Sequence, residues 1–176
     1  MFNPKALSPT VRTRIKNAKI PLNLMGRELE ELDNKVAVDQ IQLWIDNVVK
    51  GRVIKADLNP LCGKGILLQG KPGVGKTTLA CAAVQDILRK ADFKTLQPAL
   101  FIDYQKFLRL QQSTWGEDRD LDTVNLISRI LGDAHDSIEL LILDDLGKEY
   151  RAKSAWAETT FDALLRSRFN AGLPTI

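Results

Sequence analysis

The segment GKPGVGKT, residues 70–77, constrains the fold of this chain more than any other stretch. It fits the pattern G-x-x-x-x-G-K-[ST] and follows a short apolar run, GILLQ, that we expect to be a strand. The residues after it, 76–91, carry apolar side chains at helical spacing. A glycine-rich turn in this context curls its N–H groups around a phosphate, and the helix N-terminus adds its dipole. The pattern therefore predicts a strand, a phosphate-binding loop and a helix, and an unoccupied glycine-rich turn is the alternative.

The residue types of this loop indicate a nucleotide and a divalent cation as ligands. The ammonium group of Lys76 would reach the β- and γ-phosphates, and the hydroxyl of Thr77 would face Mg²⁺. We expect the nucleotide to contact the whole loop and the first residues of the helix. These residues are Gly70, Lys71, Pro72, Gly73, Val74, Gly75, Lys76, Thr77 and Thr78.

Two adjacent carboxylates, Asp144 and Asp145, end the apolar run ELLILDD at residues 139–145. Neighbouring carboxylates repel each other, and taken alone they would indicate an exposed pair at the end of a strand. A phosphate-bound Mg²⁺ gives them a role, because its charge offsets the repulsion. We expect Asp144, with Thr77, to hold Mg²⁺ partly through water, and Asp145 to polarise the attacking water. Lys76 and Asp145 are the predicted catalytic residues.

Strands alternate with helices along the rest of the chain, which predicts an α/β fold with a parallel sheet covered on both faces. The expected strands are GILLQ, 98–104 and 139–145. Residues 1–24 contain three prolines and no sustained period, so we expect an arm or linker before a domain at 25–176. The expected helices run from about Asp33 to Gly51, over 105–113, over 120–133, and from a cap at Ser154 to near Gly172.

Basic residues dominate the N-terminal segment. Nucleic-acid binding and a solvated tail are both compatible with this charge, because phosphate contacts and plain hydration favour the same side chains. The basic residues that precede the first acidic residue, Glu28, are Lys5, Arg12, Arg14, Lys16, Lys19 and Arg27.

Cys62, Cys81 and His135 lack metal-ligand spacing, so we expect two unpaired buried thiols and a surface histidine. No apolar run approaches the roughly 18 residues of a membrane helix. We therefore expect no membrane association and a cytoplasmic location.

Several segments resemble the DnaC/IstB-like AAA+ ATPases, which include helicase loaders and transposition helper ATPases. They are GKGILLQGKPGVGKTTLA, LLILDDLGKE and TTFDALLRSRFNAGLPTI. The segment IPLNLMGRELEELD (20–33) is similar to the stretch that precedes the phosphate loop in that family and lies near the adenine. The resemblance covers about residues 18–176 and implies a P-loop NTPase fold with an AAA+ core and three αβα layers.

The resemblance implies an ATP hydrolase with ATP and Mg²⁺ as cofactors. It implies a role in DNA replication, with homo-oligomers on single-stranded DNA that help to place a replicative helicase, or a transposase in IstB-type proteins. A family insertion that contributes to DNA contact corresponds to about residues 104–131. Its basic residues are Lys106, Arg109 and Arg119, and Tyr104, Phe107 and Trp115 are possible stacking partners, although Phe107 and Leu108 also fit a core position.

The family's next strand begins at LPTI, and its polar sensor residue and trans-acting arginine would lie beyond Ile176. We therefore expect a sheet that is incomplete at the C-terminus, and slow or absent hydrolysis by the isolated chain, because such an arginine contributes about 10³ or more in rate. Arg166 and Arg168 are expected to form salt bridges or to support packing. A P-loop kinase and a non-catalytic ATP-binding interaction protein remain alternatives of another class.

Overall fold

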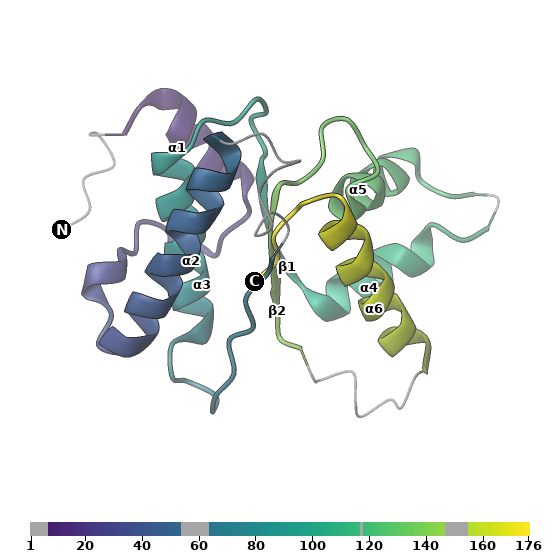
Figure 1. Cartoon of the computed structure of the whole chain (residues 1–176). Helices are drawn as coiled ribbons and strands as arrows, with labels where there is room; N and C mark the ends of the chain where they lie inside the picture. Colours follow the sequence, from purple (N-terminus) through teal and green to yellow (C-terminus); the bar gives the residue numbers. More distant parts are fainter. Residues whose placement is uncertain (1–6, 54–63, 117, 147–154) are drawn as a thin grey trace.

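The computed structural model describes residues 7–53, 64–116, 118–146 and 155–176. Two parallel strands, β1 (Ala99–Asp103) and β2 (Leu140–Asp144), lie between two groups of helices. Helices α1, α2 and α3 cover one face of this sheet, and α4, α5 and α6 cover the other (Figure 1). The fold is therefore of the α/β class, as the alternating pattern predicted.

The apolar strands divide their side chains between two cores. Ala99, Leu140 and Ile142 pack with the first helical group, whereas Leu100 and Leu141 pack with the second. This alternation follows from the two-residue period of a strand. It explains why both strands are apolar throughout: each is covered on both faces.

The predicted helices are present with small differences at their ends. Gly51 does not end its helix, since α2 continues to Val53, and Ser154 lies outside the described residues. Aspartate side chains cap the first turns of α4 and α5, in each case accepting a backbone N–H bond. The bounds are α2 Lys35–Val53, α3 Lys76–Lys90, α4 Tyr104–Ser113, α5 Leu121–Leu131 and α6 Ala155–Asn170.

Part of the segment expected to be an arm or linker is a packed helix, α1 (Pro9–Asn17). Ser8 caps it, and the side chains of Ile15 and Ile20 are buried in the first core. The backbone N–H of Phe101 donates to the carbonyl of Ala18 at 2.7 Å, which fastens the end of this segment to β1. The helix has only two and a half turns, so its apolar period was too short to be recognised in the sequence.

The run GILLQ is not a regular strand in the structure, which corrects the prediction. Within this run, the backbone N–H of Ile66 donates to the carbonyl of Thr175 at 2.8 Å. A β-ladder needs a series of such bonds. Thr175 in turn forms an isolated parallel bridge with Leu141 of β2. Residues 174–176 thus lie between GILLQ and β2. They exchange three backbone hydrogen bonds with Leu141 and Leu143 of β2, but this pairing amounts to an isolated bridge rather than a strand.

Gly65 permits this close approach. A Cβ atom at this position would lie 2.3 Å from the carbonyl oxygen of Thr175, well inside contact distance.

Among the described residues, no helix is long and apolar enough to cross a membrane.

Candidate functional site

The loop at residues 70–75 turns tightly and ends at the first residue of α3. Gly73 and Gly75 have φ of 80° and 89°, in the left-handed region that glycine adopts at low cost. A Cβ atom at either position would meet nothing within 4 Å, so the requirement is conformational rather than steric. Gly75 is the N-cap of α3 and offers no side chain to its first N–H groups. These donors therefore remain available to an anion at the helix N-terminus.

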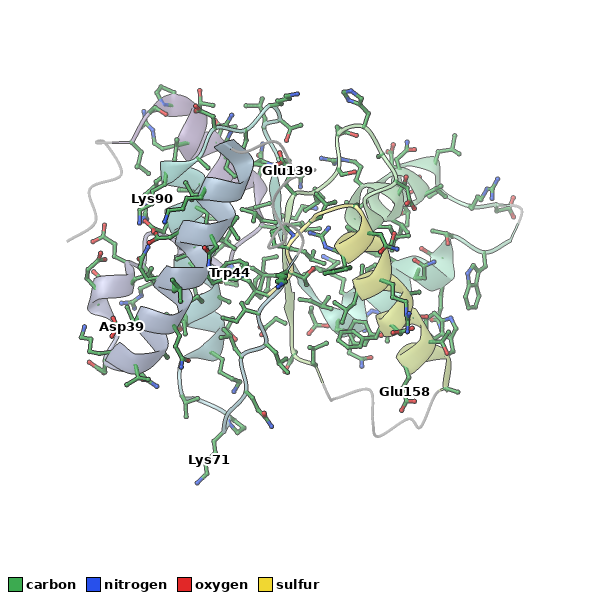
Figure 2. The ribbon with its side chains drawn as sticks, viewed as in Figure 1. Asp39, Trp44, Lys71, Lys90, Glu139 and Glu158 are labelled. Atoms are coloured by element: carbon green, nitrogen blue, oxygen red, sulfur yellow. The ribbon has the colours of Figure 1, made fainter. Side chains whose placement is uncertain are left out.

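The ammonium group of Lys76 lies over this loop. Its Nζ donates to the carbonyls of Gly70 and Lys71, each at 2.9 Å. An ammonium has three N–H donors, so one remains for a further acceptor. Lys71, by contrast, points away from the molecule into solvent (Figure 2). The structure thus distinguishes the two lysines of the loop.

Thr77 and Asp144 meet at the junction of α3 and β2. The Thr77 Oγ1 donates toward the Asp144 carboxylate, with distances of 3.1 Å to Oδ1 and 3.2 Å to Oδ2. Both side chains are half-buried. The two residues predicted to share one cation are therefore brought together, although 67 positions separate them in the sequence. Hydroxyl and carboxylate oxygens are the hard ligands that Mg²⁺ prefers, and such ions keep several waters.

Asp145 follows β2 directly and is half-buried. Its φ is 64°, a left-handed conformation that costs a residue other than glycine roughly 1–3 kcal/mol. The backbone therefore leaves the extended conformation of the strand at Asp145. Within the described residues, no group of three or more histidine, cysteine, aspartate or glutamate side chains could hold a metal ion alone.

Cys81 lies one helical turn after Thr77 on the buried face of α3. Burial, and secondarily the nearby Asp144 carboxylate, raise the pKa of its thiol from 9.0 to about 12. The thiol is free, as predicted, and it stays neutral beneath the site. His135 is exposed, also as predicted, and Cys62 lies outside the described residues.

Gln85 is a fully buried polar residue that the sequence analysis missed. Its Oε1 accepts the N–H of Gly26 at 2.7 Å, and its Nε2 donates to the carbonyls of Leu24 and Cys81 at 3.0 and 3.1 Å. This side chain fastens residues 24–26 to α3. A glutamine within the apolar stripe of α3 was the available signal, because a buried amide needs partners.

The candidate DNA-contacting residues lie on the other side of the sheet. Lys106 and Arg109 are exposed on α4, and Arg119 is exposed before α5. Tyr104 is not a stacking partner, because it is 1% exposed and its hydroxyl donates to the carbonyl of Ala157. Phe107 is buried as well, which confirms its core position.

Trp115 remains a possible stacking side chain. It is 58% exposed, and its ring meets the edge of Trp156 at a centroid distance of 5.4 Å. Trp156, near the start of α6, fits the apolar pattern of the predicted helix, but its contact with Trp115 was not predicted. An aromatic ring from the segment that follows α4 and one from α6 thus meet at one point of the surface.

Arg166 and Arg168 behave as expected from the sequence, each in a different way. Arg166 is exposed and forms an ion pair with Asp162 at 2.6 Å. Arg168 is fully buried and supports packing, and burial lowers its pKa to about 9, so it stays protonated at neutral pH. Its hydrogen-bond acceptors are Thr175 Oγ1 and the carbonyls of Ile130, Ile138, Glu139 and Pro174.

A cavity of about 630 Å³ lies outside the site formed by the glycine-rich loop, Thr77 and Asp144. It is bounded by α6, the end of β2 and residues 173–176, and its lining includes Leu67, Leu146 and Phe169. None of the predicted nucleotide or metal residues lines it.

The N-terminal end of α3 therefore brings together the Lys76 ammonium group, the Thr77–Asp144 pair and backbone N–H groups without a side-chain cap. Such a set suits an oxyanion accompanied by a hard cation. No family model, curated protein or solved structure matches the chain. The chemistry of these side chains is accordingly the ground on which a function can be assigned.

Proposed function

We propose that this chain is an ATP-binding AAA+ ATPase with a P-loop NTPase fold, of the DnaC/IstB-like type. The observation that carries the proposal is the contact between Thr77 and Asp144, with Oγ1–Oδ distances of 3.1 and 3.2 Å. A phosphate loop alone is shared by many proteins. Its combination with a carboxylate at the end of a neighbouring parallel strand is what an NTP–Mg²⁺ site requires.

Each residue of the proposed site has one task. The N–H groups of the loop and of the first turn of α3 bind phosphate oxygens, and Lys76 adds its remaining donor and its charge. Thr77 and Asp144 hold Mg²⁺, which neutralises negative charge on the β- and γ-phosphates when bound. Asp145, the next residue after β2, accepts a proton from the attacking water.

The proposed action is on DNA in the cytoplasm. The chain binds single-stranded DNA as a homo-oligomer and helps to place a replicative helicase, or a transposase if it acts as IstB does. The exposed Lys106, Arg109 and Arg119 supply phosphate contacts. Trp115 supplies a stacking surface in place of Tyr104 and Phe107, which are buried.

A nucleotide-binding titration tests the first part of the proposal. We expect a fluorescent ATP analogue to bind the chain in the presence of Mg²⁺, and Lys76→Ala to weaken binding by about tenfold or more, since a charged hydrogen bond contributes roughly 1.5–3 kcal/mol. Lys71→Ala is the matched control. This change keeps the loop backbone and removes only a side chain that points into solvent, so the variant should bind as the wild type does. Equal affinity of all three proteins would refute the proposed site.

Single-turnover hydrolysis tests the role of Asp145. We expect Asp145→Asn to leave ATP affinity nearly unchanged and to reduce the hydrolysis rate by about 10²–10⁴, the usual contribution of a general base. Asp144→Asn should instead weaken Mg²⁺-dependent binding. If Asp145→Asn hydrolyses ATP at the wild-type rate, the assignment of the base is wrong.

A further inference from the structure

A second basic surface lies far from the residues discussed so far. We call it the basic face and define it by Arg12, Lys16, Lys19 and Lys94. All four side chains are exposed, and none has an ion-pair partner among the described residues. In the sequence, no acidic residue precedes Glu28, so the segment that carries Arg12, Lys16 and Lys19 has no carboxylate of its own.

Packing fixes the direction in which this face points. Ile15 is buried against the core, and the Arg14 side chain lies over the ring of Phe93, with 5.5 Å from Cζ to the ring centroid. Arg14 also donates to the carbonyls of Phe93 and Thr95. Arg12 and Lys16, one helical turn apart, are therefore held outward, and Lys94 is held beside α1.

The carboxylates nearest to this face in the sequence lie in the last turns of α3 and just after this helix. Asp86 pairs with Lys90 at 2.5 Å, and Asp92 is the other acidic residue near the end of α3. The positive charge of the basic face is positioned by a folded helix, α1, rather than by a free tail. A rigid cationic surface attracts polyanions in preference to a second copy of itself.

The basic face is separate from both parts of the proposed site. It lies near the C-terminal end of α3, whereas the phosphate loop precedes the N-terminal end (Figure 1). The 15 residues of α3 separate the two by about 22 Å at 1.5 Å per residue. The face also lies across the sheet from α4, which carries Lys106 and Arg109.

We propose that the basic face binds the phosphate backbone of single-stranded DNA, as a contact distinct from the α4–α5 surface. This inference rests on the proposed function for the identity of the nucleic acid. Lysine and arginine contacts of this kind neutralise phosphates and position the strand without reading bases. Because the two surfaces lie on opposite faces of the sheet, a strand reaches both only by passing around the molecule or by bridging two copies.

Fluorescence anisotropy with a labelled oligo-dT tests the inference on the full chain at several salt concentrations. The first variant is Arg12→Gln/Lys16→Gln/Lys94→Gln. The charge-matched second variant is Lys106→Gln/Arg109→Gln/Arg119→Gln. We expect the first to weaken binding about tenfold at low salt and to reduce the slope of log K against log salt by about two, at roughly 0.7 per lost phosphate contact. Its affinity for the ATP analogue should stay at the wild-type value, which shows that it is folded.

The outcomes separate the inference from the proposed function. If the first variant binds DNA with the same affinity and the same salt slope as the wild type, the inference is overturned. If only the second variant weakens, the inference falls and the proposed DNA surface stands. If the wild-type chain binds no oligo-dT but binds ATP, the inference and the DNA part of the proposal fall together. Competition by poly-glutamate as strong as that by unlabelled oligo-dT would also overturn it, because an acidic protein would then be the partner.

Discussion

Replacement of Arg168 by methionine should destabilise the fold strongly. Arg168 is 0% exposed, and all five of its N–H donors are used. Its side chain connects the end of α5, the start of β2 and residues 174–175 to α6. Methionine fills a similar volume but donates no hydrogen bond, so the surrounding acceptors lose their partner.

The magnitude follows from the acceptors left behind. The Pro174 carbonyl keeps a bond from the Leu141 N–H at 3.3 Å, so it is not orphaned. The carbonyls of Ile130 and Ile138 bond to Arg168 at 2.6 and 2.9 Å. At roughly 1–3 kcal/mol for each buried acceptor without a partner, we expect a loss of about 4 kcal/mol in the free energy of unfolding. Removal of the desolvated charge offsets part of the further loss at Glu139 and Thr175.

Urea unfolding monitored by circular dichroism measures this loss. With a slope of about 2 kcal/mol per molar urea, the unfolding midpoint of Arg168→Met should fall by about 2 M. Arg166→Met is the matched control on the same helix, because its exposed ion pair with Asp162 contributes little to stability. If the two variants unfold at the same urea concentration, Arg168 does not organise the packing described here.

Three further perturbations give separate tests. Gly65→Ala should destabilise the fold by about 1–3 kcal/mol in urea, because its Cβ would lie 2.3 Å from the Thr175 carbonyl oxygen; an unchanged midpoint would contradict that close approach. Gln85→Leu should lower the free energy of unfolding by a similar amount and make the chain after Gly26 more sensitive to trypsin, since the Gly26 N–H loses its acceptor. An unchanged rate of proteolysis would contradict the role of Gln85. Burial raises the pKa of Cys81 to about 12, so the neutral thiol stabilises the fold below pH 9, and this contribution is lost as pH rises toward 12. Cys81→Ala should therefore lose less stability than the wild type between pH 9 and 11 in urea titrations, and parallel curves would contradict the raised pKa.

Periodicity was sufficient to predict most of the elements. The apolar stripe of α3 and the continuous apolar strands β1 and β2 have strong local signals, and their predicted ranges are confirmed. Helix α1 was missed because so short a helix depends on tertiary contacts, here those of Ile15 and Arg14. GILLQ has a strand composition, but a ladder depends on a partner that the composition does not describe.

In the candidate site, too, features with a local sequence motif were predicted, and features that depend on distant contacts were not. The meeting of Thr77 with Asp144 was predictable, because the loop and the strand end each carry a motif with a fixed place in the proposed fold. Gln85 and Arg168 were not recognised as network centres, because their acceptors come from segments distant in the sequence. A single polar residue indicates that partners exist but does not identify them.

The contact between Ile66 and Thr175 has a consequence for the order of folding. Its two residues lie more than 100 positions apart in the sequence, so a large loop must close before their backbone bond at 2.8 Å can form. Contacts of this kind are slow to form compared with the helices and the β1–β2 pair. The segment that leads into the glycine-rich loop is thus anchored late, and a newly collapsed chain would have its helices before this loop is fixed in place.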